Sequence, residues 1–443
     1  MVASTMLLAS LSLAFPASAA AVSGGFNVLS MNVAGLPAIF NSNGVPGDKG
    51  LNSATIGSKF GPYDVFQAQE DFNYHAQLYA ADNHQFRTAT SGPVLVGSGL
   101  NTLSKYDWVG LERVKWDSCS DISAADCFTP KGFTVMRLRL DEGVYIDFYN
   151  VHADAGDAKG DFPARASNIQ QLVDYIGANS AGNAVIIYGD MNSLYTRADN
   201  IRILSTQSNM TDVWVELIKD GITPEEASEE LACDNPTTDN ECERLDKIFY
   251  RGNRLINLTP TYWNDESTNF LQRDGSVLTD HSPITANFTW ELTEPLRQSD
   301  LFGGAYGTWF NDLDSIPTTS TGAKKPTTIS LRGAERLDSI SLTLADGTAY
   351  SHGGTGGGVS ELTLTETEYW TSARLCRGEK KGKMRNFFMT ATTNEGSKVS
   401  AGTETEDCAD FQAEEGWQIV GFYGAAGDEV DLLGFIYAPV GDE

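Results

Sequence analysis

Polar side chains that could take part in catalysis lie next to apolar runs at six places along this chain. The apolar runs have the length and composition of buried strands, so these polar groups are expected at strand ends, where they can converge. The eight residues concerned are Asn32, Glu70, His152, Asp190, Asn192, Asp246, Asp280 and His281. Only five histidines occur in the chain, and two of them belong to this set.

The combination of these side chains points to phosphate ester cleavage. Carboxylate and amide oxygens that converge bind a hard divalent cation. Two histidines beside such a cation can supply acid and base, and a metal ion with histidine and carboxylate hydrolyses phosphoesters. An all-oxygen ligand set favours Mg²⁺, which Mn²⁺ or Co²⁺ could replace, whereas zinc would call for a histidine or cysteine cluster.

The elements that must position these residues alternate between strands and a helix. Apolar residues at 169, 172, 173 and 176 share one face of a helix that begins near Pro163. Strand, helix and strand in succession predict a layered α/β domain. The expected strands cover Phe26–Met31, Asp64–Gln69, Val144–Val151, Ala184–Tyr188 and Ile284–Trp290.

The order of the six motifs resembles that of the endonuclease/exonuclease/phosphatase superfamily, the DNase I-like phosphoesterases. The motifs are LSMNVAGLP, FQAQED, NVHADAG, YGDMN, RLDKIFY and LTDHSP. The resemblance covers residues 24–291. It implies a four-layer α/β sandwich, in which two packed sheets are flanked by helices and the active site lies at one edge.

The resemblance also implies a role for each polar residue. Glu70, Asn32 and Asp280 would hold the metal ion. His152 would protonate the leaving oxygen or stabilise charge on the pentacoordinate phosphorus, and Asn192 would bind a phosphate oxygen.

The identity of the general base stays open between two residues. In one scheme His281 takes the proton of the attacking water, Asp246 fixes the tautomer of His281, and Asp190 orients the water. In the other scheme Asp190 is the base and His281 contacts the phosphate. The sequence does not separate the two.

The substrate class rests on one segment and on charge. Lys131-Gly132, after the cysteine-bounded loop and before a strand, resembles the neutral, Mg²⁺-dependent sphingomyelinases. The inositol phosphatase branch has Trp-Cys-Asp-Arg where this chain has Arg244-Leu245-Asp246-Lys247, and the formal net charge of −28 disfavours a nuclease. A sphingomyelinase C is therefore the favoured enzyme, with an extracellular nuclease or an inositol phosphate phosphatase as the alternatives. Tyr262-Trp263 and Phe270-Leu271 are candidates for an apolar membrane-binding hairpin.

The composition changes after the polar segment Leu292–Asp300, and an all-β second domain is expected over residues 299–443. FGGAYGTWFND, SHGGTGGG and GAAGDEVDLLGFIYAP resemble a jacalin-related lectin domain, which implies a β-prism with a sugar site on loops at one end. By this resemblance Gly427 and Asp431, with Gly303 or Gly304, would bind sugar hydroxyls, and Tyr423 is a candidate ligand-facing aromatic residue. The prism could tether the enzyme to surface glycans. A non-enzymatic alternative is a sugar-binding lectin whose enzyme-like domain is inactive. The intact set of eight polar residues disfavours this alternative.

The N-terminus and the cysteines predict an exported protein. Residues 1–19 contain a short apolar run and an Ala17-Ser18-Ala19 cleavage site, which is typical of a signal peptide, and no later run is long enough to span a membrane. The six cysteines fall into local pairs that proximity would join as disulfides. The expected pairs are Cys119–Cys127, Cys233–Cys242 and Cys376–Cys408, and sequons for glycosylation occur at Asn209, Asn257 and Asn287.

Overall fold

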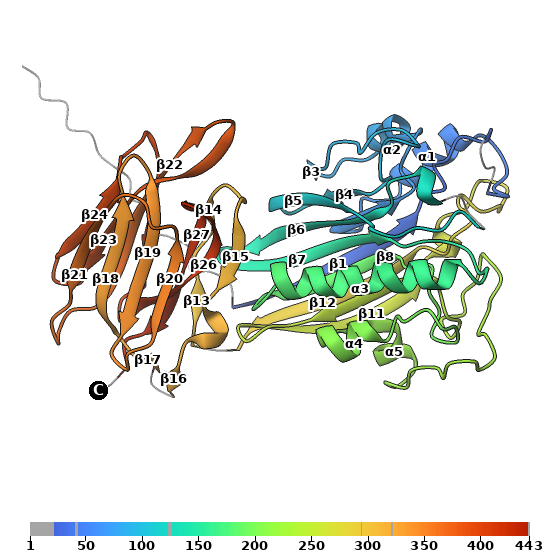
Figure 1. Cartoon of the computed structure of the whole chain (residues 1–443). Coiled ribbons are helices and arrows are strands. Elements are labelled where there is room, and N and C mark those ends of the chain that lie inside the picture. Colours follow the sequence, from blue (N-terminus) through green and yellow to red (C-terminus); the bar gives the residue numbers. More distant parts are fainter. Residues whose placement is uncertain (1–21, 40–42, 123–125, 294, 320–321, 442–443) are drawn as a thin grey trace, which may run out of the picture.

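The computed structural model describes residues 22–39, 43–122, 126–293, 295–319 and 322–441. The expected signal segment, residues 1–19, lies outside these ranges. Figure 1 shows two bodies side by side, an α/β sandwich and an all-β prism. The fold predicted from the sequence is confirmed in both bodies.

Two six-stranded sheets form the inner layers of the sandwich, in the orders β11-β12-β1-β2-β4-β3 and β5-β6-β7-β8-β10-β9. The strands of the first sheet are β1 (Ser23–Asn32), β2 (Val65–Gln69), β3 (Phe86–Arg87), β4 (Asn101–Ser104), β11 (Ile256–Asp265) and β12 (Ile284–Leu292). Those of the second are β5 (Trp108–Lys115), β6 (Gly132–Asp141), β7 (Val144–His152), β8 (Ala184–Asp190), β9 (Thr211–Asp212) and β10 (Asp246–Arg251).

Helices cover both outer faces of the sandwich. The predicted apolar face of α3 packs into the core that β6, β7 and β8 share, whereas α1 and α2 bury Ile56 and Leu78 against the first sheet. The helices are α1 (Lys49–Gly57), α2 (His75–Ala81), α3 (Asp161–Asn179), α4 (Ile203–Ser208) and α5 (Val213–Ile218), with 3₁₀ turns at Asp126–Phe128, Ser267–Asn269 and Leu313–Ser315.

Three sheets and a short ribbon build the prism. The first sheet contains β13 (Arg297–Gln298), β14 (Phe302–Gly303), β15 (Thr308–Asn311), β26 (Trp417–Ala426) and β27 (Val430–Pro439). The second contains β18 (Pro326–Gly333), β19 (Leu337–Leu344), β20 (Ala349–Gly353) and β21 (Gly358–Thr363). The third contains β22 (Trp370–Lys380), β23 (Lys383–Thr393), β24 (Lys398–Gly402) and β25 (Asp407–Gln412), and the ribbon pairs β16 (Thr318–Thr319) with β17 (Gly322–Ala323).

The three expected disulfides are present, and they join Cys119–Cys127, Cys233–Cys242 and Cys376–Cys408. Two expectations about aromatic residues are wrong. Trp263 and Phe270 are buried, so these residues do not form an exposed apolar hairpin. Tyr423 is buried as well and its hydroxyl donates to the carbonyl of Ser299, so it does not face a ligand. Within the described residues, no helix combines the length and the apolar character that a membrane crossing requires.

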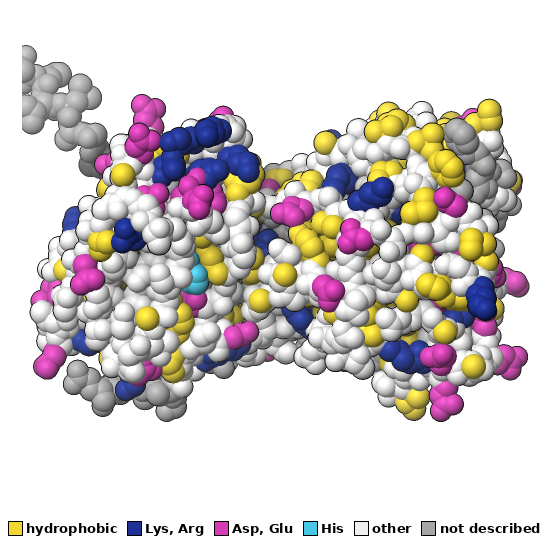
Figure 2. All heavy atoms as spheres, in the orientation of Figure 1, with side chains coloured by type: hydrophobic (Ala, Val, Ile, Leu, Met, Phe, Trp, Pro, Cys, Tyr) yellow, Lys and Arg dark blue, Asp and Glu magenta, His cyan; other side chains and the backbone are white. Residues whose placement is uncertain are grey.

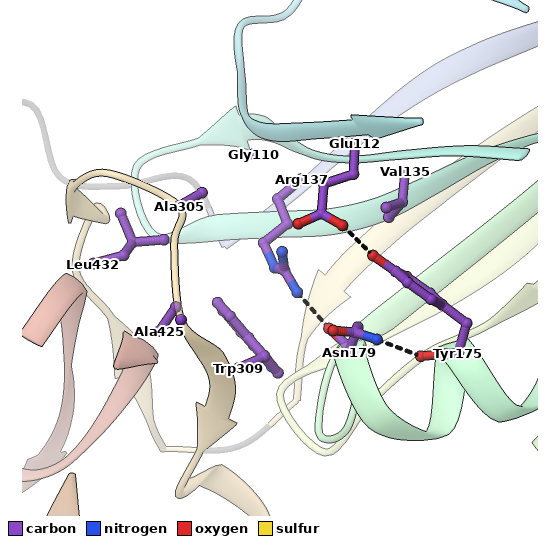
Figure 3. A pocket seen from close by; sticks show the side chains of 11 residues that line it. Gly110, Glu112, Val135, Arg137, Tyr175, Asn179, Ala305, Trp309, Ala425 and Leu432 are labelled. Atoms are coloured by element: carbon purple, nitrogen blue, oxygen red, sulfur yellow. Dashed lines mark hydrogen bonds between the residues drawn. The ribbon is translucent and has the colours of Figure 1, made fainter. Parts of the chain in front are cut away.

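The sandwich and the prism meet in a tightly packed seam. Figure 3 shows the Arg137 guanidinium beside the indole of Trp309, and its carbon lies 3.7 Å from the centre of that ring. The Trp309 Nε1 donates to the carbonyl of Ala181 at 3.2 Å. Between the bodies remains a cavity of about 30 Å³, which has room for about one water molecule.

A second group of contacts joins the start of β7 to the prism. The Asp300 carboxylate accepts two hydrogen bonds from Arg139, both at 2.8 Å, and one from the amide of Gly143 at 3.0 Å. Gly143 has φ +66°, and a Cβ there would lie 1.8 Å from the carbonyl oxygen of Gln298. The seam therefore requires glycine at this position.

Replacing Trp309 by alanine tests how strongly the seam couples the two bodies. We expect Trp309→Ala to lower the free energy of unfolding by about 3–5 kcal/mol, because it removes a buried indole and its hydrogen bond. Calorimetry should show the unfolding transition split in two. The control Val359→Ala changes a mostly exposed side chain and should unfold like the wild type; a single, unshifted transition in Trp309→Ala would contradict the expectation.

Candidate active site

The strand ends of both sheets meet at the edge of the sandwich that lies away from the prism. Parallel pairing places Asn32 beside Gln69, so that Glu70 follows directly, and places His152 beside Asp190. Antiparallel pairing of β10 with β8 brings Asp246 to Asp190. The predicted convergence of these residues is therefore what the strand register produces.

Asp190 is the centre of the cluster. Its Oδ2 accepts a hydrogen bond from Asn32 Nδ2 at 3.1 Å and lies 3.4 Å from Nε2 of His152 and 3.6 Å from Nε2 of His281. Its Oδ1 accepts from the amide of Asn192 at 3.0 Å. Burial raises the pKa of Asp190, but the interactions with His281, His152 and Lys131 outweigh burial and lower the pKa overall. Asp190 is thus an ionised hydrogen-bond acceptor.

His281 and Asp246 form a pair in which Nδ1 lies 2.9 Å from Oδ2. Burial lowers the pKa of His281, but the charges of Asp190 and Asp246 raise it well above its usual value. Burial raises the pKa of Asp246, and the charge of His281 offsets part of that rise. The pair has the donor, acceptor and orientation that a general base and its partner need.

His152 differs from His281 in charge. Its side chain is almost fully buried, and its Nδ1 has no hydrogen-bond partner among the described residues. Burial, and then the charge of Lys131, hold the pKa of His152 well below its usual value. A neutral imidazole is suited to donate one hydrogen bond to a developing charge, which is the second of the two roles expected for His152.

Glu70 presents an oxygen that needs a partner. Its Oε2 is buried and accepts no hydrogen bond from any residue in the described ranges. Burial raises the pKa of Glu70, the charge of Lys131 lowers it, and the charge of Asp280 raises it again. A buried carboxylate without a partner is costly unless a cation compensates its charge, so the surroundings of Glu70 fit a divalent metal ion.

Asp280 lies at the exposed rim of the cluster. Its Oδ2 accepts from Asn43 Nδ2 at 2.9 Å, and Asn43 in turn accepts from Lys49 Nζ at 2.9 Å. Lys49 also donates to the carbonyl of Ala34 at 3.0 Å. Burial lowers the pKa of Lys49, while Glu70 and Asp280 raise it. Sequence reasoning missed Lys49, because a lysine in a Gly-rich loop is usually a surface residue.

A second cation, Lys131, lies on the other side of the cluster. Its Nζ is 2.6 Å from Oδ1 of Asp126. Asp126 belongs to the segment that the Cys119–Cys127 disulfide closes. Its positive charge acts on Glu70, His152 and Asp190 alike. The segment that resembles sphingomyelinases therefore contributes a cation to the site.

An open cleft of about 440 Å³ adjoins His281. Asp246 and Asp280 line it together with Arg197, Arg244 and Asn235, which sequence reasoning did not find. Asn235 donates its Nδ2 to the carbonyl of His281 at 3.1 Å. Asn235 follows Cys233, so the Cys233–Cys242 disulfide helps to fix the loop that holds His281.

Asp190, Asp246 and His281 also place one ligand atom each within 4.8 Å of one another. His281 lies between the two carboxylates, with Nδ1 toward Asp246 and Nε2 toward Asp190, so we interpret the three as a proton-transfer group, although Asp246 Oδ1 accepts no hydrogen bond from any described residue. The oxygens of Glu70, Asn32 and Asp280 are the better donors for a hard cation.

The candidate sugar residues gather at one end of the prism. The carbonyl of Asp431 accepts the amide of Gly304 at 2.9 Å, and Gly303 pairs with Leu432. The amide of Gly427 donates to Glu429. Because the amides of Gly304 and Gly427 are engaged, they are not available to a ligand. Tyr306, which sequence reasoning missed, is the partly exposed aromatic residue beside Gly304.

Comparison with known proteins agrees with this geometry. Residues 49–287 match the model of the Endonuclease/Exonuclease/phosphatase family 2. The chain belongs to the endonuclease/exonuclease/phosphatase family. Residues 299–436 of this family member match the jacalin-like lectin domain.

Among curated proteins, the sphingomyelinases of Mycobacterium bovis and Mycobacterium tuberculosis are each 35% identical over 277 residues, which is 60% of this chain and 53% of theirs. This family member spans about half the length of the curated relatives it matches. Among solved structures, sphingomyelinase C from Streptomyces griseocarneus is 18% identical, with a TM-score of 0.41, over 60% of this chain and 99% of its own. A mannose-binding jacalin-related lectin from Ananas comosus is 22% identical, with a TM-score of 0.29, over 33% of this chain and 100% of its own.

Asp154, two residues after His152, gives a test of the electrostatics. Burial raises its pKa from 3.8 to about 6, and Asp126 and Asp161 add to the rise. Between these values the folded state binds more protons than the unfolded state, so this group makes the protein less stable as pH increases. At pH 7 its ionisation costs at most about 3 kcal/mol.

We therefore expect Asp154→Asn to be more stable than the wild type near pH 7, with the difference fading as pH falls to about 4. The amide oxygen of asparagine can still accept from the amide of Ser120, which Asp154 Oδ2 accepts at 2.7 Å. Chemical unfolding at several pH values measures this, with the exposed Asp174→Asn as control. A difference that stays constant with pH would refute the shifted pKa.

Proposed function

We propose that this chain is an exported, Mg²⁺-dependent phosphodiesterase of the sphingomyelinase C type, whose prism binds sugar. The observation that carries the proposal is the meeting of Glu70, with its unpartnered carboxylate oxygen, and the His281–Asp246 pair around Asp190. The identity to sphingomyelinases supports the substrate class. The three disulfides support export, because they persist in oxidising compartments.

Glu70, Asn32 and Asp280 would hold the cation. When bound, the cation stabilises the negative charge on a phosphate oxygen. Asn192, whose Nδ2 donates to Ala153 at 3.2 Å, lies beside Asp190, where it can contact the same phosphate. His152 would donate a hydrogen bond from its neutral ring to a phosphoryl oxygen, where negative charge develops in the transition state.

His281 acts as the general base in this proposal. Its Nε2 would take the proton of the attacking water, Asp190, whose Oδ2 lies 3.6 Å from that nitrogen, would orient the water, and Asp246 would stabilise the imidazolium that forms. The scheme with Asp190 as the base is the alternative, and it places a protonated His281 against the phosphate.

Substrate and metal dependence are tested together. Sphingomyelin vesicles, DNA and inositol phosphates are each incubated with the protein in Mg²⁺ and in EDTA. We expect phosphocholine release from sphingomyelin in Mg²⁺ only, and a loss of about 10²-fold or more in Glu70→Gln, because the cation stabilises the transition state by several kcal/mol.

Glu70→Gln removes a buried, unpartnered charge, so its unfolding temperature should not fall. Glu226→Gln, at an exposed position, is the matched control and should keep full activity. Cleavage of DNA or inositol phosphates alone would exclude the sphingomyelinase assignment, and equal activity in EDTA would exclude the metal ion.

The pH dependence separates the two bases. If neutral His281 is the base, kcat/KM on a soluble phosphodiester increases with pH through a value above the usual 6.5, because the carboxylates raise the pKa of His281. Asp246→Asn removes one of these charges, so the acid limb should move to lower pH while the plateau drops by about 10²–10⁴-fold. A profile that is flat through neutral pH in both proteins would identify Asp190 as the base.

The prism would bring the enzyme to glycan-bearing surfaces. The seam packs too closely for a truncation to test this, since removal of the prism would expose sandwich residues that are buried against it, such as Tyr145. Point substitutions in the sugar site leave the sandwich intact and are the better tool.

A further inference from the structure

The prism carries a basic hairpin in a strongly acidic chain. Five of the chain's 31 lysines and arginines fall within the nine residues 377–385, although the formal net charge is −28. These residues form the end of β22, the turn and the start of β23. Figure 2 shows basic side chains gathered at the top of the left-hand body, where β22 reaches in Figure 1.

The hairpin lies against the loops that carry the candidate sugar residues. A Cβ on Gly304 would lie 2.3 Å from the carbonyl oxygen of Met384, so the glycine loop touches the start of β23. The Nζ of Lys383 lies 4.8 Å from the ring centre of Tyr306 in the same loop. An Arg385 Nη1 nitrogen is 3.2 Å from Oδ1 of Asp431. Cations therefore surround the carboxylate that would bind sugar hydroxyls.

This end of the prism also gathers buried polar atoms that form no hydrogen bond, although one of them, Asp431 Oδ1, is in ion-pair contact with Arg385. Five buried side-chain atoms without a hydrogen bond are found in the described part of residues 299–443, and four of them belong to this cluster. They are Arg336 Nε, Arg385 Nε, Asn386 Oδ1 and Asp431 Oδ1. Buried polar groups are normally satisfied, so their concentration indicates that a polar ligand completes the site.

Most cations of the hairpin already have an acidic partner. Lys380 pairs with Glu335 at 3.0 Å, Arg377 with Asp407 at 2.8 Å, and Arg385 with Glu429 as well as Asp431. Lys383 is exposed and forms no ion pair with any residue in the described part of the chain. A free ammonium thus stands above the glycine loop.

We propose that the prism site takes a sugar that carries a carboxylate, such as a hexuronic acid; this inference rests on the proposed function of the prism as a sugar-binding domain. A neutral sugar that used both oxygens of Asp431 would have to displace Arg385. An acidic sugar places its own carboxylate between Lys383 and Arg385, while its hydroxyls donate to Asp431. Charge-assisted hydrogen bonds of this kind are about twice as strong as neutral ones.

The test is calorimetric titration of the full chain with glucuronate, glucose and mannose. We expect glucuronate to bind at least about tenfold more tightly than the neutral sugars, and its affinity to fall as salt increases. Lys383→Gln should weaken glucuronate binding about fivefold or more and leave hydrolysis of a soluble phosphodiester unchanged. Lys398→Gln removes an exposed lysine from the same sheet and should change neither.

Each other outcome overturns the inference in a distinct way. Equal affinity for neutral and acidic sugars, unaffected by Lys383→Gln, would keep the sugar-binding function and reject the acidic ligand. If none of the three sugars binds, both the acidic ligand and the sugar-binding function of the prism would be rejected. Binding to vesicles that contain phosphatidylserine, without glucuronate binding, would assign the basic hairpin to an anionic membrane surface.

Discussion

Like charges buried close together are the constraint on which the site depends. Glu70, Asp190 and Asp246 lie at the same edge of the sandwich, and carboxylates that close cannot all stay ionised without compensation. His281 and Lys131 compensate part of that charge through their interactions with Asp190. Glu70 remains with an unpartnered oxygen. A divalent cation beside Glu70 would offset the negative charge of the three carboxylates. Metal binding would then also set the protonation states on which catalysis depends.

The loops around the edge serve this balance. The Cys119–Cys127 disulfide closes the segment that presents Asp126 to Lys131, and the Cys233–Cys242 disulfide closes the loop from which Asn235 holds the His281 backbone. Both cross-links lie where a long surface loop must place a side chain accurately. A disulfide there limits the conformations that the loop can adopt in the unfolded chain, so the loop needs fewer packing contacts to hold one conformation in the folded protein.

The parts of this structure that follow local patterns could be predicted from the sequence. The helix α3 follows from its apolar spacing, and the convergence of Asn32, Glu70, His152, Asp190 and Asp246 follows from their places at strand ends. Other features depend on contacts between elements that are distant in sequence, and local patterns do not predict them. A bulge between Pro260 and Tyr262 shifts the register of β11, so that Trp263 faces the core. Lys49 begins α1 and reaches the site by donating to the carbonyls of Ala34 and Leu36. Arg385 meets Asp431 only because two separate sheets pack against each other.

If the prism binds a surface glycan, the seam would make it a rigid anchor instead of a flexible tether. Strand β7 begins beside the prism at Val144 and ends at His152, so the active site lies about 26 Å from the seam at a rise of about 3.3 Å per residue. A flexible linker would let the enzyme sample a volume around its anchor, whereas a packed seam holds it at one distance and orientation. A prism that binds an acidic glycan through its basic hairpin would turn the rest of this acidic chain away from the anionic surface. Substrate would then be reached only where glycan and phosphoester lie at that fixed spacing, so surface architecture would add to the specificity of the site.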